Sequence, residues 1–260
     1  MITTEYQING STDLTIAIVA DLHEHKPDQV LSILREVKPD VIAVPGDLFE
    51  NHVHGENLDK YDTSFVSKIL CFCIHLADRI AGMRKNRKRD VKKEYAYRFL
   101  RDACEIAPVL YSLGNHELYL TDEDRAVIEE TGTVLLNNSS VVVNGTLFAG
   151  IPSKQCSGKI DTVFLEEFSN RPGYKVLLCH HPEYYEVVAQ YSDLILSGHC
   201  HGGQMRICGH GLFAPGQGLF PRYHHGVYEK MVVSSGCSNT ASIPRIGNKT
   251  EVVIIRIRKV

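Results

Sequence analysis

The chain alternates short apolar runs with stretches in which apolar residues recur at helical spacing. Residues Leu14–Ala20 (LTIAIVA) are rich in β-branched side chains and are typical of a strand buried on both faces. After Pro27-Asp28 the apolar positions follow a helical period, and Val41–Val44 is the next apolar run, ending at Pro45-Gly46. A strand, a helix and a strand in this order predict a βαβ unit with parallel strands and a right-handed crossover.

The rest of the chain continues this mixed pattern. Asn144-Gly145 separates two apolar runs and predicts a hairpin with a type I′ turn. We expect a helix over Tyr95–Ile106 and strands at Val109–Leu113, Val141–Val143, Thr146–Ala149, Lys175–Leu178 and Leu194–Leu196. The C-terminal runs predict an antiparallel sheet formed by Val227–Tyr228, Met231–Val233 and Val252–Ile257. Without internal repeats or a Pro/Gly linker, we expect one domain over residues 1–260, with a helical insertion at about 51–108.

The insertion combines an apolar helical face with a cluster of positive charge. Apolar residues recur at helical intervals over Phe65–Met83, and seven of the ten residues in Arg84–Lys93 are basic. One interpretation is a helix packed on the body with a solvated, charged turn. The other is an interfacial helix in peripheral contact with an anionic membrane. Nucleic-acid binding is not expected, because no aromatic residues are interleaved with the charges.

Composition narrows the class of protein. The chain has 260 residues, of which 43% are hydrophobic and 23% charged, as in an ordinary globular protein. Its formal net charge of −3 argues against a polybasic nucleic-acid binder. The longest apolar run, Ile69–Ile74, is too short for a transmembrane helix, and the first residues do not resemble a secretory signal. Eight cysteines without paired spacing indicate thiols in a reducing compartment, so a cytoplasmic location is expected.

Polar clusters follow five of the predicted strands. Because ligands of open α/β sheets bind beyond the carboxyl ends of the strands, we expect these clusters to converge on one place. Carboxylates beside imidazoles in a dry crevice are costly unless a metal ion holds them. The clusters are Asp21-Leu22-His23, Gly46-Asp47, Gly114-Asn115-His116-Glu117, His180-His181 and Gly198-His199-Cys200-His201.

Taken in order, DLH, GD, GNHE, the histidine after LLC, and GHCH resemble the calcineurin-like metallophosphoesterase superfamily. The GHCHGGQ stretch is similar to a bacterial phosphodiesterase subgroup. The resemblance implies a mixed α/β (α+β) fold, a four-layer sandwich of two central mixed β-sheets flanked by helices. It also implies hydrolysis of a phosphodiester or pyrophosphate bond by a hydroxide that bridges two metal ions. A phosphomonoesterase and a non-catalytic metal-binding scaffold on the same fold remain alternatives.

The resemblance also assigns roles to individual residues. Two divalent transition-metal ions are implied, and the donor set leaves Mn, Fe, Zn and Co open. His116 would protonate the leaving oxygen or stabilise the transition state, and Glu50 stands where relatives carry an aspartate that orients this histidine. The substrate would be a small-molecule phosphoester, with lipid-linked and nucleotide-linked esters both open. The first ion would be held by Asp21, His23, Asp47 and His201, and the second by Asp47, Asn115, His180 and His199.

The remaining histidines have weaker assignments. His181 should face away from the metals if the segment after its strand stays extended. The pair His224-His225 could reach the substrate, as the subgroup resemblance suggests. For the others we expect solvated or packing roles: His25, His52, His54 and His75.

Overall fold

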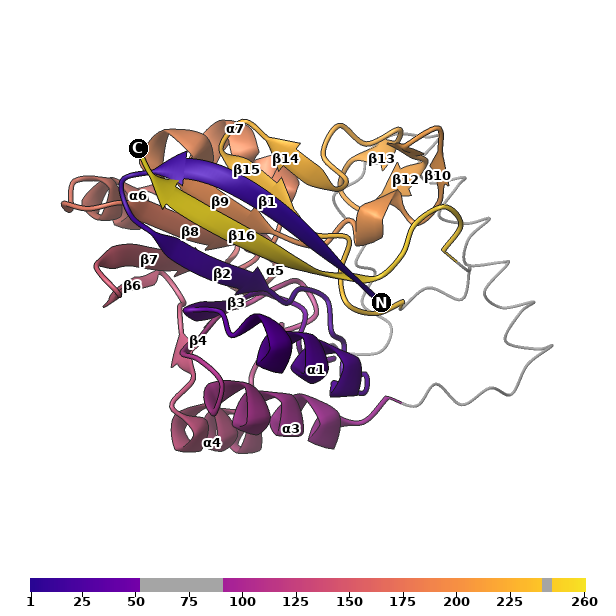
Figure 1. Ribbon diagram of the computed structural model, residues 1–260, viewed down its shortest axis with the longest axis horizontal. Helices are drawn as coiled ribbons and strands as arrows, with labels where there is room; N and C mark the ends of the chain where they lie inside the picture. The colour runs from indigo at the N-terminus through magenta and orange to yellow at the C-terminus, as the bar shows by residue number, and fades with distance from the viewer. Residues whose placement is uncertain (52–90, 240–244) are drawn as a thin grey trace.

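Two six-stranded β-sheets pack face to face, and helices cover their outer faces (Figure 1). The computed structural model describes residues 1–51, 91–239 and 245–260. The predicted sandwich of two mixed sheets flanked by helices is confirmed. Outside the described residues lie the predicted helix over Phe65–Met83, most of the basic run and three of the histidines: His52, His54 and His75.

The first sheet contains the βαβ unit and both ends of the chain. Strands β2 to β5 run parallel, β16 is antiparallel to β2, and β1 is parallel to β16. The loops after β2, β3 and β4 consequently leave from the same edge of the sheet. In spatial order the strands are β1 (Ile2–Gly10), β16 (Glu251–Lys259), β2 (Leu14–Ile18), β3 (Val41–Pro45), β4 (Val109–Ser112) and β5 (Val134–Leu135).

The second sheet has four parallel central strands and an antiparallel strand at each edge. The β6–β7 hairpin turns at Asn144 and Gly145, whose φ angles of 50° and 74° fit the predicted type I′ turn. In spatial order the strands are β14 (Gly226–Tyr228), β15 (Met231–Val233), β9 (Leu194–Ser197), β8 (Lys175–Cys179), β7 (Thr146–Ile151) and β6 (Ser139–Val143).

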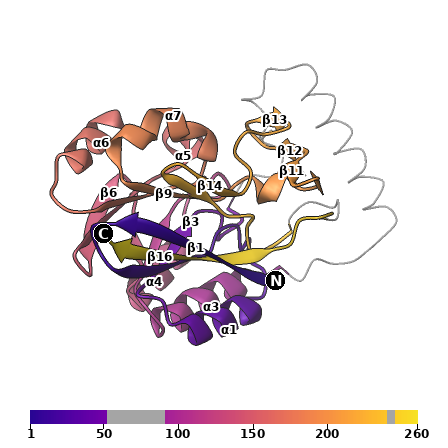
Figure 2. The same ribbon diagram turned by 45° about the horizontal axis from the view of Figure 1, so that its top comes forward.

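Alternation of side chains along the strands sorts the buried residues into three apolar layers. Ile16 and Ile18 of β2 point between the sheets, towards Phe148 and Leu178 of the second sheet. The outer face of the first sheet packs against α1 (Asp28–Val37), α3 (Lys93–Cys104) and α4 (Asp122–Thr131). The outer face of the second sheet packs against α6 (Thr162–Ser169) and α7 (Tyr185–Val188), as Figure 2 shows. Each large aliphatic side chain buried in these layers contributes about 2 kcal/mol to folding.

Short elements connect the layers. The helix α5 (Lys154–Ser157) follows β7, and four two-residue strands form two hairpins beside the second sheet (Figure 2). The short elements are η1 (Pro182–Tyr184), η2 (Ala189–Tyr191), η3 (His201–Gly203), β10 (Arg206–Ile207), β11 (His210–Gly211), β12 (Phe213–Ala214) and β13 (Gly218–Leu219).

The predicted C-terminal antiparallel sheet is confirmed for its first two strands, since β14 and β15 pair antiparallel, and is wrong for the third. β14 and β15 belong to the second sheet, where β15 pairs in parallel with β9. β16 belongs to the first sheet, between β1 and β2. A hydrophobic run predicts a strand, but its partners are set by packing against distant elements.

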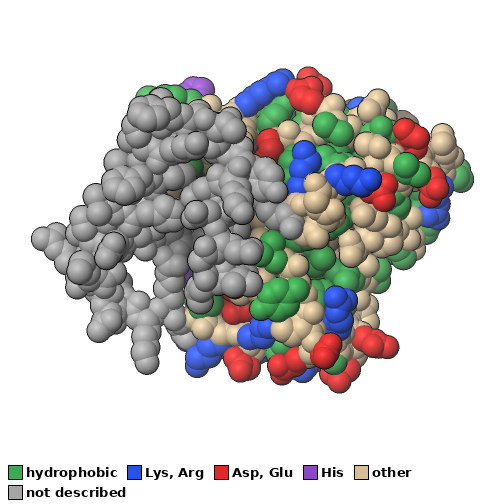
Figure 3. All heavy atoms as spheres, turned by 180° about the vertical axis from the view of Figure 1, so that it is seen from behind, with side chains coloured by type: hydrophobic (Ala, Val, Ile, Leu, Met, Phe, Trp, Pro, Cys, Tyr) green, Lys and Arg blue, Asp and Glu red, His purple; other side chains and the backbone are tan. Residues whose placement is uncertain are grey.

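The surface of the described part carries charges of both signs. On the face drawn in Figure 3, Lys and Arg side chains alternate with Asp and Glu side chains over the described region. No helix among the described residues is long and apolar enough to cross a membrane.

Candidate metal centre

Five loops bring the predicted site residues to one edge of the sandwich. They follow β2, β3 and β4 of the first sheet and β8 and β9 of the second. Side-chain ligand atoms come within 4.8 Å of one another in three groups made up entirely of predicted residues: Asp21 with His23 and His201, His23 with Asp47 and His116, and Asp47 with His180 and His199. Asn115 joins the last group, because its Oδ1 is 3.1 Å from His180 Nε2.

Asp47 lies at the centre of this cluster and is almost fully buried. Its Oδ2 is 3.1 Å from His180 Nε2, 3.6 Å from His23 Nε2 and 3.9 Å from His116 Nε2. Its Oδ1 accepts the backbone N–H of His116 at 3.0 Å. Burial alone would raise the pKa of Asp47, but His180 and His116 hold it well below the usual range. The carboxylate is therefore ionised and available to more than one partner.

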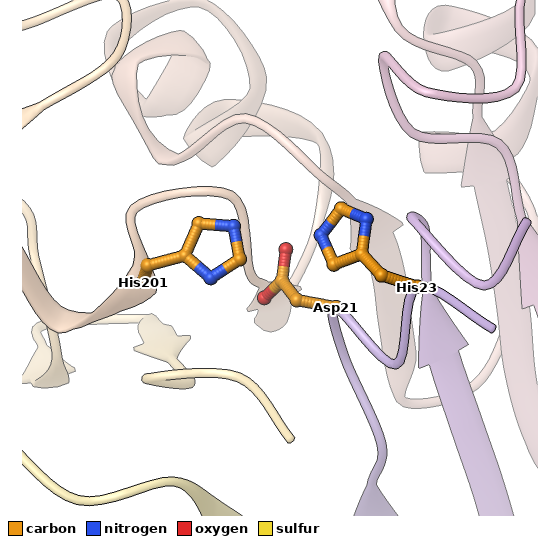
Figure 4. Close-up of side chains that lie close together, drawn as sticks. All are labelled: Asp21, His23 and His201. Carbon is orange, nitrogen blue, oxygen red and sulfur yellow. The ribbon is translucent and has the colours of Figure 1, made fainter. Parts of the chain in front are cut away.

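Asp21, His23 and His201 point towards one another (Figure 4). Asp21 Oδ1 accepts the backbone N–H of His199 at 3.0 Å. Asp21 Oδ2 and His23 Nε2 are buried and have no hydrogen-bond partner within the described residues. Leaving such atoms unpaired is costly unless a cation satisfies them. Carboxylate oxygen and imidazole nitrogen are donors suited to divalent transition metals, so these residues fit a metal ion.

The backbone is strained where the side chains converge. Five of the seven predicted ligands have positive φ, between 44° and 70°: Asp21, His23, Asp47, His199 and His201. Non-glycine residues seldom adopt this region, and such strain concentrates at functional sites. Glycines allow the loops to approach: a Cβ at Gly46 would lie 2.6 Å from His180 Nδ1, and one at Gly114 would collide with the Asp47 side chain.

The outward-facing nitrogens of the cluster histidines have different partners. His180 Nδ1 lies 2.7 Å from the Pro45 carbonyl, and His23 Nδ1 lies 2.6 Å from Glu50 Oε1. When these nitrogens donate, the Nε2 lone pairs are left free for a metal. His201 Nδ1 instead lies 3.0 Å from Nη2 of Arg245, which can only donate.

Glu50 holds two histidines with its two carboxylate oxygens. Oε1 contacts His23, and Oε2 is 3.0 Å from His116 Nδ1. Burial lowers the pKa of His116, but Asp47 and Glu50 outweigh it and raise the pKa to about 9. A protonated His116 would donate through Nδ1 to Glu50 and keep a second proton on Nε2, the nitrogen nearest to Asp47.

Glu117 of the GNHE cluster has a role that the sequence analysis missed. Its buried carboxylate accepts backbone N–H groups from two loops: Asp47 at 3.0 Å, Leu48 at 2.5 Å, Phe49 at 2.9 Å and Gly114 at 2.6 Å. This side chain ties the loop after β3 to the loop after β4. One signal of this role was present in the sequence: Glu117 is an acidic residue inside a cluster of candidate ligands, although the family resemblance assigns it no function.

The histidines outside the candidate ligand set have contacts of their own. Nδ1 of His181 lies 2.9 Å from Glu183 and its Nε2 lies 2.7 Å from Ser153, so both ring nitrogens have partners outside the candidate ligand set. His224 and His225 stack on each other, 5.4 Å apart, after the β12–β13 hairpin. Their contact with substrate stays a prediction.

A sandwich of two mixed sheets with carboxylates and imidazoles gathered at the strand ends is an arrangement that suits a metal-dependent hydrolase. The sequence profile of the calcineurin-like phosphoesterase family matches residues 14–203, and the chain belongs to this family. The superfamily resemblance seen in the sequence is confirmed.

Several proteins are similar over most of the chain. A metallophosphoesterase of Aquifex aeolicus is 25% identical over 98% of this chain and 86% of its own length. The YpbG protein of Bacillus subtilis is 24% identical over 96% of this chain and 83% of its own length. The metallophosphoesterase YkoQ of the same organism is 27% identical over 68% of this chain and 71% of its own length. Among solved structures, the similarity to the SoxB sulfate thiohydrolase of Thermus thermophilus covers 92% of this chain and 53% of the SoxB chain, with a TM-score of 0.40 and 11% sequence identity.

Proposed function

We propose that this protein is a binuclear-metal-dependent phosphoesterase that hydrolyses a phosphodiester or pyrophosphate bond. Metal-dependent phosphoester hydrolysis follows from family membership. The binuclear centre is supported by one observation above all: Asp47 belongs to two neighbouring groups of ligand atoms, one on the His23 side and one on the His180 side. A carboxylate in that position would serve both ions, because its Oδ2 lies 3.6 Å from His23 Nε2 and 3.1 Å from His180 Nε2.

We assign the ligands as the family resemblance implies. Asp21, His23 and His201 with Asp47 form the first site, and Asn115, His180 and His199 with Asp47 form the second. When bound, the two ions would activate water and neutralise the charge of the phosphoryl group. The unpaired Asp21 Oδ2 and His23 Nε2 support the first site. The contact between Asn115 Oδ1 and His180 Nε2 supports the second.

His116 is proposed as the group that protonates the leaving oxygen. Its Nδ1 is held by Glu50, and its Nε2 faces the cluster. In the metal-free protein its pKa is about 9, so the ring is protonated at neutral pH. General acid catalysis of this kind accelerates hydrolysis by about 10²–10⁴-fold. Glu50 would act as a positioning residue that fixes which nitrogen donates.

The proposal is tested with two chromogenic esters. Protein stripped of metal by a chelator is reloaded with Mn²⁺, Fe²⁺, Zn²⁺ or Co²⁺ in separate samples, and bound metal is counted. We expect two ions per chain, no turnover without metal, and faster cleavage of bis-p-nitrophenyl phosphate than of p-nitrophenyl phosphate. Preference for the monoester would make the protein a phosphomonoesterase. Two bound ions with no turnover of either ester would indicate a metal-binding scaffold.

The natural substrate is proposed to be a small phosphoester linked to a lipid or a nucleotide. A panel of nucleotide, sugar-nucleotide and lipid phosphoesters, assayed with Mn²⁺, separates these classes. The sequence of Arg84–Lys93 favours a lipid, because its seven basic residues would attract an anionic membrane surface. Cosedimentation with neutral and anionic vesicles tests this contact, which salt should weaken. A cytoplasmic location, peripheral to the membrane, would be consistent with such binding.

A further inference from the structure

A hydrogen-bonded chain of three buried or half-buried side chains lies behind the second proposed metal site. His181 follows β8, and Ser153 follows β7. Ser153 Oγ is 2.7 Å from His181 Nε2, and His181 Nδ1 is 2.9 Å from Glu183 Oε1. Because a carboxylate only accepts, the neutral His181 ring donates its Nδ1–H to Glu183 and accepts from the Ser153 hydroxyl. This arrangement fixes both the ring and the carboxylate.

His199 lies against this chain. The centres of the His181 and His199 rings are 4.1 Å apart, and His199 Nε2 is 3.9 Å from Glu183 Oε1. The other carboxylate oxygen, Glu183 Oε2, is buried and has no hydrogen-bond partner within the described residues. Among the described residues, Glu183 thus keeps one buried carboxylate oxygen without a hydrogen-bond partner, while its other oxygen lies 3.9 Å from His199 Nε2.

The position of Glu183 is also fixed from the opposite side. Gly216, between β12 and β13, has a φ of 73°, and a Cβ at that position would collide with Glu183 Oε1. The loop therefore packs its backbone directly against the carboxylate. A side chain confined by a histidine on one side and a glycine backbone on the other has little freedom to turn away.

Comparison with the neighbouring histidines indicates what this confinement does. His180 has the Pro45 carbonyl behind its outer nitrogen, and His23 has Glu50. Histidines that bind metals almost always donate their second N–H to such an acceptor, which sets the tautomer and the ring orientation. For His199 the corresponding group is the Glu183 carboxylate, whose Oε1 lies 3.9 Å from Nε2, just beyond hydrogen-bond distance.

We propose that Glu183 is a positioning residue for the second metal site: when an ion binds, the 3.9 Å gap closes, and Glu183 accepts the Nε2–H of His199 and so leaves the Nδ1 lone pair for the ion. The inference rests on the proposed binuclear function. His181 and Ser153 hold Glu183 in place for this task. The competing explanation is that His181, Glu183 and His199, whose ligand atoms lie within 4.8 Å of one another, hold a third ion themselves.

Metal titration of the full chain separates the two. We compare wild type with Glu183→Gln, and use Glu186→Gln as the matched control, because Glu186 is exposed and pairs with Arg222. Calorimetry with Mn²⁺ on metal-stripped protein should give two ions in all three proteins. In Glu183→Gln one of the two should bind about 10–100-fold more weakly. Glu183→Asp keeps the charge at a shorter reach and should fall between wild type and Glu183→Gln.

A second measurement assigns the effect to His199. In His199→Ala the second site is already weakened, so adding Glu183→Gln should cause little further loss of Mn²⁺ affinity. Unchanged Mn²⁺ affinity in Glu183→Gln, fully additive losses in the double variant, or three ions in wild type and two in Glu183→Gln would each overturn the proposal. A protein with two ions and the expected losses, but no ester cleavage, would contradict the proposed function and leave this inference intact.

Discussion

The two halves of the candidate centre are held in place by different means. In the loops of the first sheet, Glu117 gathers four backbone N–H groups, and Asp47 and Asp21 each accept a further one. In the loops of the second sheet, His180 and His201 are held through the outer nitrogens of their rings, as His23 also is in the first sheet. The first half is a rigid scaffold for carboxylates. In the second half, the contact to one ring can be changed without changing the other, because Pro45 contacts His180 and Arg245 contacts His201.

The partners themselves also differ in kind. His180 is backed by a carbonyl oxygen, whereas His201 is backed by the Arg245 guanidinium. An acceptor leaves the inner nitrogen free for a metal, but a donor leaves the proton of the neutral ring on that nitrogen. The proposed site that contains His201 should therefore bind its ion more weakly than the proposed site that contains His180.

The largest effect is expected from Asp47→Asn, since both proposed ions depend on this residue. A neutral amide cannot bridge two cations as a carboxylate does, and metal ions supply several kcal/mol of transition-state stabilisation. We expect both metal content and diester turnover to fall, the latter by about 10³-fold or more. Asp40→Asn, at an exposed aspartate, should match wild type. Normal metal content in Asp47→Asn would remove the bridging role.

His116→Asn tests chemistry apart from metal binding. Both ions should remain, but turnover should fall by about 10²–10⁴-fold for esters with poor leaving groups, and less for p-nitrophenyl esters. The pKa of His116 is about 9 in the metal-free protein and should be lower once two cations neutralise Asp47, so wild-type turnover should decline at alkaline pH, beginning below that value. The variant should lack this alkaline decline. Equal losses on good and poor leaving groups would favour charge stabilisation over proton donation.

Glu117→Gln tests the scaffold half alone. The amide nitrogen would face backbone N–H groups that need an acceptor, so at least two buried donors lose their partner. We expect the free energy of unfolding to fall by about 3 kcal/mol, measured by urea denaturation of the metal-free protein. Glu105→Gln, at an exposed glutamate of the same charge, is the control. Unchanged stability would mean that the loops are held by other contacts.

Arg245→Gln gives the smallest expected effect and the sharpest test of the contrast between the two sites. Glutamine can accept the Nδ1–H of His201, which would move the neutral ring to the tautomer that suits a metal. One of the two ions should then bind more tightly, by about tenfold. Arg206→Gln is the matched control, since Arg206 also bonds to Ser235 but not to His201. Weaker Mn²⁺ binding in Arg245→Gln would show that the arginine supports the site.

Local pattern determined the elements and the identity of the candidate residues. The apolar run at Leu14–Ala20 predicted β2, and the helical spacing of apolar residues after Pro27 predicted α1. These predictions succeed because the residues that a strand or a helix buries recur in the sequence with the geometry of that element. Asn144-Gly145 predicted the β6–β7 hairpin, because two successive positive φ angles need such residues. The polar clusters at the strand ends predicted which side chains would meet at the carboxyl edge.

Only the tertiary structure decided which strands are neighbours and which groups contact the candidate ligands from outside the centre. β16 has the same apolar pattern as a strand of either sheet, and packing between β1 and β2 selects the first. Glu117 reaches backbone groups nearly 70 residues away, Glu183 meets His199 across two loops, and Arg245 meets His201 only in the folded chain. Such contacts join side chains to groups distant in the sequence, so no local period encodes them. They arise when the loops are brought together by the sheets that carry them.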